Sequence, residues 1–209
     1  MTTPHSADHL YSKSNPYTSG LLVNRVMTEG SDKETRHFEF SLQDSGLSYE
    51  PGDSLGVLPV NCPDVVDDLL SILGFSGSEP VQVGEESFSL KDTLLHKFAC
   101  TVLSKIQIKK FNEIARVPAL EELLKIENKN DLVDYMWGRE LIDLFKEYPQ
   151  QGLAVEDFAS LLRPMPPRLY SIASSLSAHS EEVHLTVAVV RYDSHGRKRK
   201  GVCSSYLAE

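Results

Sequence analysis

One short stretch of this chain, residues 168–175, has the richest chemistry, because it combines an arginine, a tyrosine and three serine hydroxyls. Tyr170 and Ile172 favour a strand. On a strand, Arg168 and Tyr170 share one face and Ser171 lies on the other. A guanidinium can bind a phosphate through two parallel hydrogen bonds, and a tyrosine ring can lie flat on another planar ring. The stretch therefore predicts a seat for a phosphate-bearing aromatic cofactor; the alternative is an ordinary amphipathic strand before a serine-rich turn.

A second stretch, Gly201 to Ser205, has the residue types that suit a pyrophosphate. Gly201 permits a turn and a close ligand approach. A helix that begins here presents free N–H groups and the positive end of its dipole, and Ser204 adds a hydroxyl. The alternative is an ordinary capped helix.

Other reactive side chains do not form recognisable sites. Cys62, Cys100 and Cys203 are far apart and form no Cys-x-x-Cys pair, so neither a disulfide framework nor a metal site is predicted. Cys203 has no histidine paired with it in a motif, and a small residue beside a phosphate loop is its expected role. None of the seven histidines shows His-x-x-x-His spacing, and His37 is expected on the polar face of a strand.

The composition indicates a soluble globular protein. The chain has 209 residues, a net charge of −9 and 41% hydrophobic residues. The acidic balance argues against a general nucleic-acid or anionic-membrane binder. No apolar run approaches the ~18 residues of a membrane span, and no signal core begins the chain, so the expected location is the cytoplasm. The one basic run, Arg197 to Lys200, is expected to be the solvated tip of a hairpin; alternatively it attracts a cofactor phosphate or an acidic partner.

Strand patterns occupy both ends of the chain. After a polar tail or linker at 1–16, we expect a mostly buried strand at 20–27 and an alternating strand at 35–42. A Pro-Gly turn and a third strand follow at 49–57, and 182–192 is the strongest strand of all. Successive antiparallel strands with tight turns predict a small barrel or sandwich.

The middle of the chain has helical periodicity. Pro63 lies near a helix start and Gly74 ends that helix. Residues 80–83 favour a short strand, and the stretch from Lys91 to about Leu162 is largely helical. Its predicted helical segments are 103–116, 118–126, 130–136, 139–147 and 155–162. The expected fold is thus mixed α+β, an antiparallel β-barrel (17–60 and 163–209) with a large helical insertion (61–162).

The Arg-x-Tyr-Ser-x-x-Ser stretch, followed downstream by 201–207, resembles the FAD-binding modules of the ferredoxin–NADP⁺ reductase superfamily. The Tyr-x-Pro-Gly-Asp turn at 49–53 also recurs in that superfamily's barrel. The resemblance implies that Arg168 holds the FAD pyrophosphate and that Tyr170 stacks on the isoalloxazine ring. It also implies that Ser171 hydrogen-bonds near the reactive ring nitrogen and so serves catalysis.

The resemblance implies further contacts. Main-chain groups of the central strand would line FAD, a tyrosine would pack near it, and a glycine-led loop would hold the pyrophosphate. One arginine of the connecting helices would reach FAD, and one on the first strand would contact the NADPH phosphates. An ordinary strand-end aromatic and a solvated arginine are the alternatives for the tyrosine and the first-strand arginine. The main-chain groups are those of Thr186, Val187 and Ala188, the tyrosine is Tyr192, and the loop consists of Gly201, Val202, Cys203 and Ser204. The arginine of the connecting helices is Arg139 and that of the first strand is Arg25. Leu169, within the Arg-x-Tyr-Ser motif, is a further expected cofactor contact.

The long helical insertion resembles that of NADPH-dependent diflavin reductases, and the strand sequences 183–187 and 189–193 resemble the sulfite-reducing branch. Such an enzyme passes hydride from NADPH to FAD, then electrons through FMN to a haem–iron-sulfur subunit. Alternatives are a reductase for cytochrome P450 or another haem acceptor, and a non-catalytic flavin-binding or interaction module. No Gly-x-Gly-x-x-Gly occurs and an FMN domain does not fit, so we expect a domain-sized piece without NADPH activity of its own.

Overall fold

A computed structural model describes residues 11–209, so most of the predicted tail at 1–16 lies outside the described residues. The chain divides into two compact units. The first unit contains the described residues up to Pro59, together with Pro166–Arg191 and Cys203–Glu209. The second unit contains Val60–Met165 and Tyr192–Val202. Each unit has its own apolar core.

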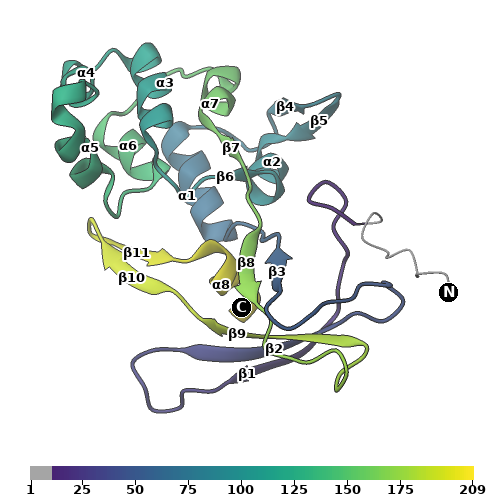
Figure 1. Cartoon of the computed structure of the whole chain (residues 1–209). Coiled ribbons are helices and arrows are strands. Elements are labelled where there is room, and N and C mark those ends of the chain that lie inside the picture. Colours follow the sequence, from purple (N-terminus) through teal and green to yellow (C-terminus); the bar gives the residue numbers. More distant parts are fainter. Residues whose placement is uncertain (1–10) are drawn as a thin grey trace. The chain divides into compact units, whose positions relative to one another are not determined.

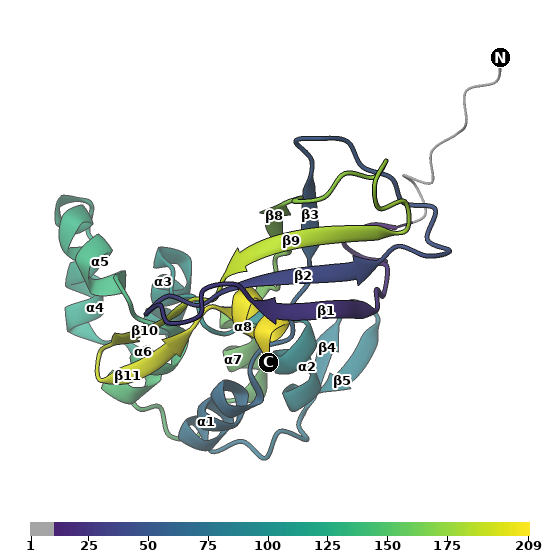
Figure 2. The ribbon, with the colours of Figure 1, turned by 90° about the horizontal axis from the view of Figure 1, so that it is seen from below.

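The first unit is built on a three-stranded antiparallel sheet in the order β1-β2-β9 (Figures 1 and 2). A second, two-stranded antiparallel sheet pairs β3 with β8. The bounds are β1 Leu21–Val26, β2 Thr35–Ser41, β3 Ser54–Val57, β8 Arg168–Ser171 and β9 Glu182–Ala188. The short helix α8, Val202–Ala208, follows near the C-terminus.

The alternation of β2 and β9 decides which face of the sheet is buried. Because side chains alternate along a strand, every second residue of each strand faces the core. Those residues are apolar in both strands, and two residues of α8 pack against them. The core of the first unit consists of Phe38, Phe40, Leu42, Val183, Leu185, Val187, Cys203 and Leu207.

Strand β1 corrects one expectation. The sequence predicts a mostly buried strand, but Leu21, Leu22 and Val26 are 49%, 52% and 36% exposed. β1 is an edge strand that pairs only with β2, and the apolar core of the first unit contains no residue of β1. Hydrophobic residue types therefore report strand propensity here rather than burial.

The predicted strand at 182–192 is interrupted. β9 ends at Ala188, and a separate hairpin follows, formed by β10 (Arg191–Ser194) and β11 (Arg197–Lys200). At the break, the N–H of Val190 donates to Oγ of Ser204 at 3.1 Å. The backbone group is thus satisfied outside the sheet, and the ladder ends.

The second unit is mainly helical. The first helix, α1 (Pro63–Leu73), begins with a proline, and Gly74 caps it in the left-handed conformation with φ of 72°. The other helices are α2 Leu90–His96, α3 Lys105–Ala115, α4 Pro118–Leu123, α5 Lys129–Met136, α6 Leu141–Glu147 and α7 Val155–Leu161. A 3₁₀ turn, η2, lies at Ile126–Asn128. In the described chain even the longest helices, of 11 residues, are too short to cross a membrane.

Short antiparallel pairs accompany the helices. The predicted strand at Pro80–Val83 is confirmed as β4, and it pairs with β5 (Glu86–Ser89), which the sequence pattern did not indicate. β6 (Phe98–Ala99) pairs with β7 (Arg163–Pro164). The mixed fold with antiparallel sheets is confirmed. The described residues form separate two- and three-stranded sheets rather than a closed barrel.

The basic run corrects a second expectation. It is not a solvated tip: the turn lies at 195–196, and the run itself forms β11. Arg199 is buried, and its guanidinium donates to Glu140 at 2.8 Å and to Asp143 at 2.6 Å. Arg197 lies 3.4 Å from the same two carboxylates. The alternation of β11 turns both arginines toward α6 and leaves Lys198 exposed.

The two carboxylates have a second role in the helix. Glu140 and Asp143 form a capping box at the start of α6, each bonding the other's backbone N–H. Burial raises the pKa of Glu140, and the Arg199 and Arg197 guanidinium groups oppose that increase. The ion pairs therefore connect the start of α6 to the hairpin strand β11 and oppose the effect of burial on the Glu140 carboxylate.

We expect Arg199→Ala to destabilise the second unit by about 3–5 kcal/mol, because it leaves two buried carboxylates without their cation. Lys198→Ala, on the exposed side of the same strand, is the matched control and should change stability by less than ~0.5 kcal/mol. Urea unfolding followed by the helical circular dichroism signal measures both. Equal, small effects would show that the buried pair contributes little.

Candidate functional site

The motif strand β8 has the alternation that the sequence predicts. Arg168 and Tyr170 pair with Val57 and Leu55 of β3, and Tyr170 packs against the core of the first unit. Leu169 and Ser171, on the other side of the strand, are exposed. The backbone thus presents an arginine and a tyrosine on one side and a serine on the other.

Three predicted site residues meet in the first unit. The thiol of Cys203 contacts the hydroxyl of Tyr170, and Arg168 is close enough to both to act on their pKa values. Burial is the main cause that raises the pKa of Tyr170 and that of Cys203. A protonated, buried thiol is a poor nucleophile, so the structure supports a packing role for Cys203.

Arg168 has the environment of a ligand-binding cation. It is exposed, and within the described residues it forms neither an ion pair nor a hydrogen bond. By contrast, Arg36, Arg191 and Arg199 each contact a carboxylate. A guanidinium without an acidic partner, beside a half-buried tyrosine ring, fits an anionic ligand that carries an aromatic group.

The loop from Gly201 to Ser204 joins β11 to α8. The helix begins at Val202. Ser204 is buried, and its Oγ accepts the backbone N–H of Val190. Gly201 and Val202 are part-buried and belong to the second unit, whereas Cys203 and Ser204 belong to the first.

The strand β9 carries the predicted main-chain contacts. Val187 is buried in the core, and Thr186 and Ala188 lie exposed on the opposite face. β9 is an edge strand of its three-stranded sheet, with one isolated bridge from Leu185 to Ile172 on its outer side. Main-chain groups at a sheet edge are available for hydrogen bonds to another molecule.

Three other predicted residues belong to other elements. Tyr192 is 48% exposed on β10, and Arg139 stacks over the ring of Tyr135 at 4.1 Å while donating to its carbonyl. Both belong to the second unit. Arg25 is exposed on β1 of the first unit. Their proposed contacts with a cofactor stay predictions.

A cavity of about 610 Å³ in the first unit was not foreseen from the sequence. Its walls are mainly apolar and include Phe40, Leu42 and Val183 from the core, together with residues 11–13 and 16–19. Such a cavity has no local sequence signal, because its walls come from segments that are distant in the chain.

Comparisons with known proteins identify the family of this chain. A family model described as FAD binding domain matches residues 10–206. The sulfite reductase (NADPH) flavoprotein alpha-component of Bacillus subtilis is 46% identical over 202 residues, which cover 95% of this chain and 33% of that protein. The proteins of the same name from Zymomonas mobilis and Mannheimia succiniciproducens are 42% and 40% identical over 200 residues, again 95% of this chain and 32% and 33% of theirs. This chain thus spans about a third of the length of the curated relatives it matches. Because the family match extends over nearly all of its residues, the chain belongs to the FAD-binding domain family.

Proposed function

We propose that the first unit binds FAD, with Arg168 on the pyrophosphate and Tyr170 against the isoalloxazine ring. The observation that carries this assignment is the exposed guanidinium of Arg168, which has no acidic partner among the described residues and lies beside the ring of Tyr170. A hydrogen bond between charged groups is among the stronger polar contacts available to a ligand.

The neighbouring residues complete the proposed site. Main-chain groups of Thr186 to Ala188 at the β9 edge would contact the flavin, and the Gly201–Ser204 loop would adjoin the pyrophosphate. Leu169 and Ser171 are exposed beside them, and the Ser171 hydroxyl would hydrogen-bond near the reacting ring nitrogen. Bound FAD supplies the redox chemistry, since it accepts a hydride and releases electrons singly. The protein's residues hold and orient it. Tyr192 and Arg139 are proposed as further FAD contacts and Arg25 as a contact of NADPH phosphates.

The division into units supports a proposed domain organisation. We assign 17–60 and 163–209 to an FAD-binding β-barrel module, 61–162 to an inserted helical connecting domain, and 1–16 to a linker. The compact second unit draws most of its residues from Val60–Met165, which supports the insertion. The separate sheets of the first unit would be parts of the barrel.

The names of the relatives support a larger role. We propose that the chain is the FAD region of an NADPH-dependent sulfite reductase flavoprotein. Hydride would pass from NADPH to FAD, and electrons through FMN to a sulfite-reducing haem subunit. Apart from the proposed contact of Arg25 with the NADPH phosphates, the FMN and NADPH sites would be formed by other domains of the enzyme, and the proposed location is the cytoplasm. Two alternatives are a reductase for cytochrome P450 or another haem protein, and a non-catalytic flavin-binding module. Sulfite-dependent NADPH oxidation by the parent enzyme would support the sulfite reductase and argue against both alternatives.

The chain should bind FAD more tightly than FMN. Arg168 and the Gly201–Ser204 loop suit a pyrophosphate, which FMN lacks. Calorimetric titration of the flavin-free chain with each flavin checks this. Equal or tighter FMN binding would contradict the assignment.

Arg168→Ala should weaken FAD binding by about 10- to 150-fold, since a hydrogen bond to a charged group is worth roughly 1.5–3 kcal/mol. Arg163→Ala, which removes another exposed arginine, is the control and should leave the affinity unchanged. Thermal unfolding without FAD should be the same in both variants. Lost stability with unchanged affinity would make Arg168 a structural residue.

Tyr170→Phe should bind FAD nearly as well as the unchanged chain, whereas Tyr170→Ala should bind about 2- to 13-fold less tightly, since ring stacking is worth ~0.5–1.5 kcal/mol. The Ala variant should also lose stability because the ring packs on the core. Fluorescence titration measures the affinities. If Phe were as damaging as Ala, the hydroxyl beside Cys203 rather than the ring would be the important group.

A further inference from the structure

The face of the three-stranded sheet opposite its core carries a cluster of histidines and carboxylates, here called the histidine face. His37 and Glu39 are two apart on β2, and Glu182 and His184 are two apart on β9. Register pairs Glu39 directly with His184. Because paired residues of antiparallel strands point to the same side, all four lie together, and His179 joins them from the preceding turn.

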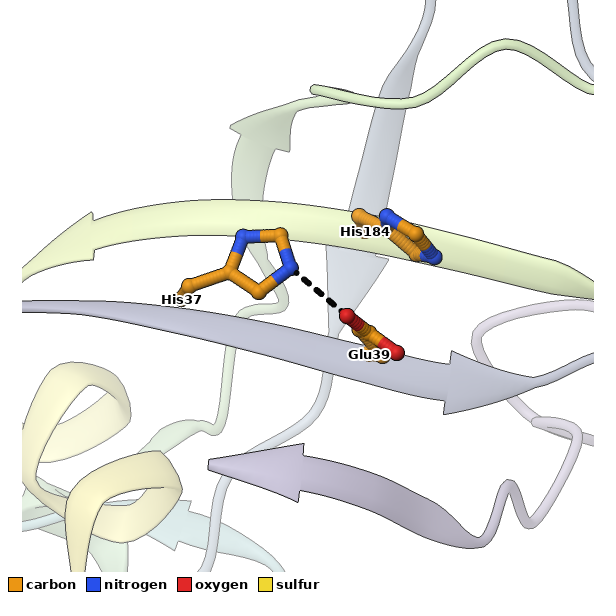
Figure 3. A group of neighbouring side chains, drawn as sticks. All are labelled: His37, Glu39 and His184. Carbon is orange, nitrogen blue, oxygen red and sulfur yellow. Dashed lines mark hydrogen bonds and ion pairs between the residues drawn. The ribbon is translucent and has the colours of Figure 1, made fainter. Parts of the chain in front are cut away.

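The donor atoms are close enough to share one ion. In the group His37, Glu39 and His184, the nearest nitrogen and oxygen atoms all lie within 4.8 Å of one another. The Nε2 atom of His37 is 3.0 Å from a carboxylate oxygen of Glu39. Figure 3 shows the three side chains on the same side of β2 and β9. Ligands on a tetrahedral zinc ion with bonds of ~2.0–2.1 Å are about 3.4 Å apart, so small side-chain rotations suffice.

The three side chains are held by a rigid and partly dry environment. His184 is 6% exposed although it faces away from the core, and the side chains of His37 and Glu39 are 15% and 25% exposed. The two strands pair with each other along this whole stretch, from Thr35 with Ala188 to Ser41 with Glu182. Sites on paired strands keep their geometry better than sites on loops.

The surrounding groups suit a cation with nitrogen ligands. Glu182 bonds Nε2 of His184 at 2.9 Å, and a carboxylate on a ring nitrogen is a common support for a metal-binding histidine. His179 lies with its ring 4.3 Å from that of His184 and covers the cluster from the turn. Arg25, the register partner of His37, is exposed, so its charge can extend into solvent.

We propose that His37, Glu39 and His184 form a binding site for a divalent transition-metal ion of the zinc class. The ion would take the place of the hydrogen bond that joins His37 Nε2 to Glu39. A proton carried by Nε2 would move to Nδ1 of the ring or be released to solvent. Imidazole ligands favour zinc, cobalt or nickel over magnesium and calcium, which prefer all-oxygen sites. The ion would link β2 to β9 and stabilise the first unit, independently of any flavin.

The test is calorimetric titration of the untagged, EDTA-treated chain with ZnCl₂, with MgCl₂ as the negative probe. We expect one Zn²⁺ per chain and no heat with Mg²⁺. His37→Gln and His184→Gln should each weaken Zn²⁺ binding at least about tenfold. His96→Gln, which removes an exposed histidine of the second unit, should not. Zn²⁺ should raise the unfolding temperature of the unchanged chain and not that of the His184 variant.

A second measurement identifies the ligands even if one variant folds poorly. The Co²⁺ complex should lack a sulfur-to-metal charge-transfer band, and Glu39→Gln should weaken Co²⁺ binding. Absence of Zn²⁺ binding, or unchanged affinity in the His37 and His184 variants, would overturn the proposal. So would a thiolate band that Cys62→Ser removes. A larger loss in His179→Gln than in His37→Gln would place the ion in the turn-side group with Glu182, and the proposed triad would be wrong.

Discussion

The first unit depends on one long-range interaction, the pairing of β2 with β9. Seven residue pairs, from Thr35 with Ala188 to Ser41 with Glu182, connect segments that are far apart in the chain. Bringing such segments together costs loop-closure entropy before any contact is gained. The register is nevertheless well determined, because a slip of one residue would expose Phe38 and bury Glu39. The same alternation that builds the core therefore also builds the opposite face.

This pairing also positions the motif strand. Ile172 bridges to Leu185, and the N–H of Ala173 donates to the carbonyl of His184 at 2.9 Å. The end of β8 is thereby attached to β9, so that Tyr170 packs against the core while Arg168 remains exposed. An aromatic ring held by the core and a cation without an acidic partner among residues 11–209 are the two properties that the proposed FAD site requires. Neither depends on loop flexibility.

The second unit relies on a different kind of restraint. Its apolar core is extensive, but the β10–β11 hairpin is attached to α6 through Arg199, a buried cation between two buried carboxylates. Breaking such a pair is costly because it leaves uncompensated charge in a dry environment. The hairpin leads directly into the Gly201–Ser204 loop, so this ion-pair network stabilises one side of the segment that we assign to the pyrophosphate.

The sequence alone determined most of the local structure and the family. The motif strand with its alternation, the helices between Pro63 and Leu161, and the left-handed cap at Gly74 all follow from short-range periodicity and residue type. The tertiary structure decided what depends on distant partners: the exposure of β1 as an edge strand and the strand break where Val190 bonds Ser204. It likewise decided the burial of Arg199, because the carboxylates that neutralise it lie at the start of α6. The histidine face also depends on the tertiary structure, because its proposed ligands come from two strands that only the fold brings together. Periodicity describes which side of an element is apolar, whereas the partner that covers each side is set by contacts between segments distant in sequence.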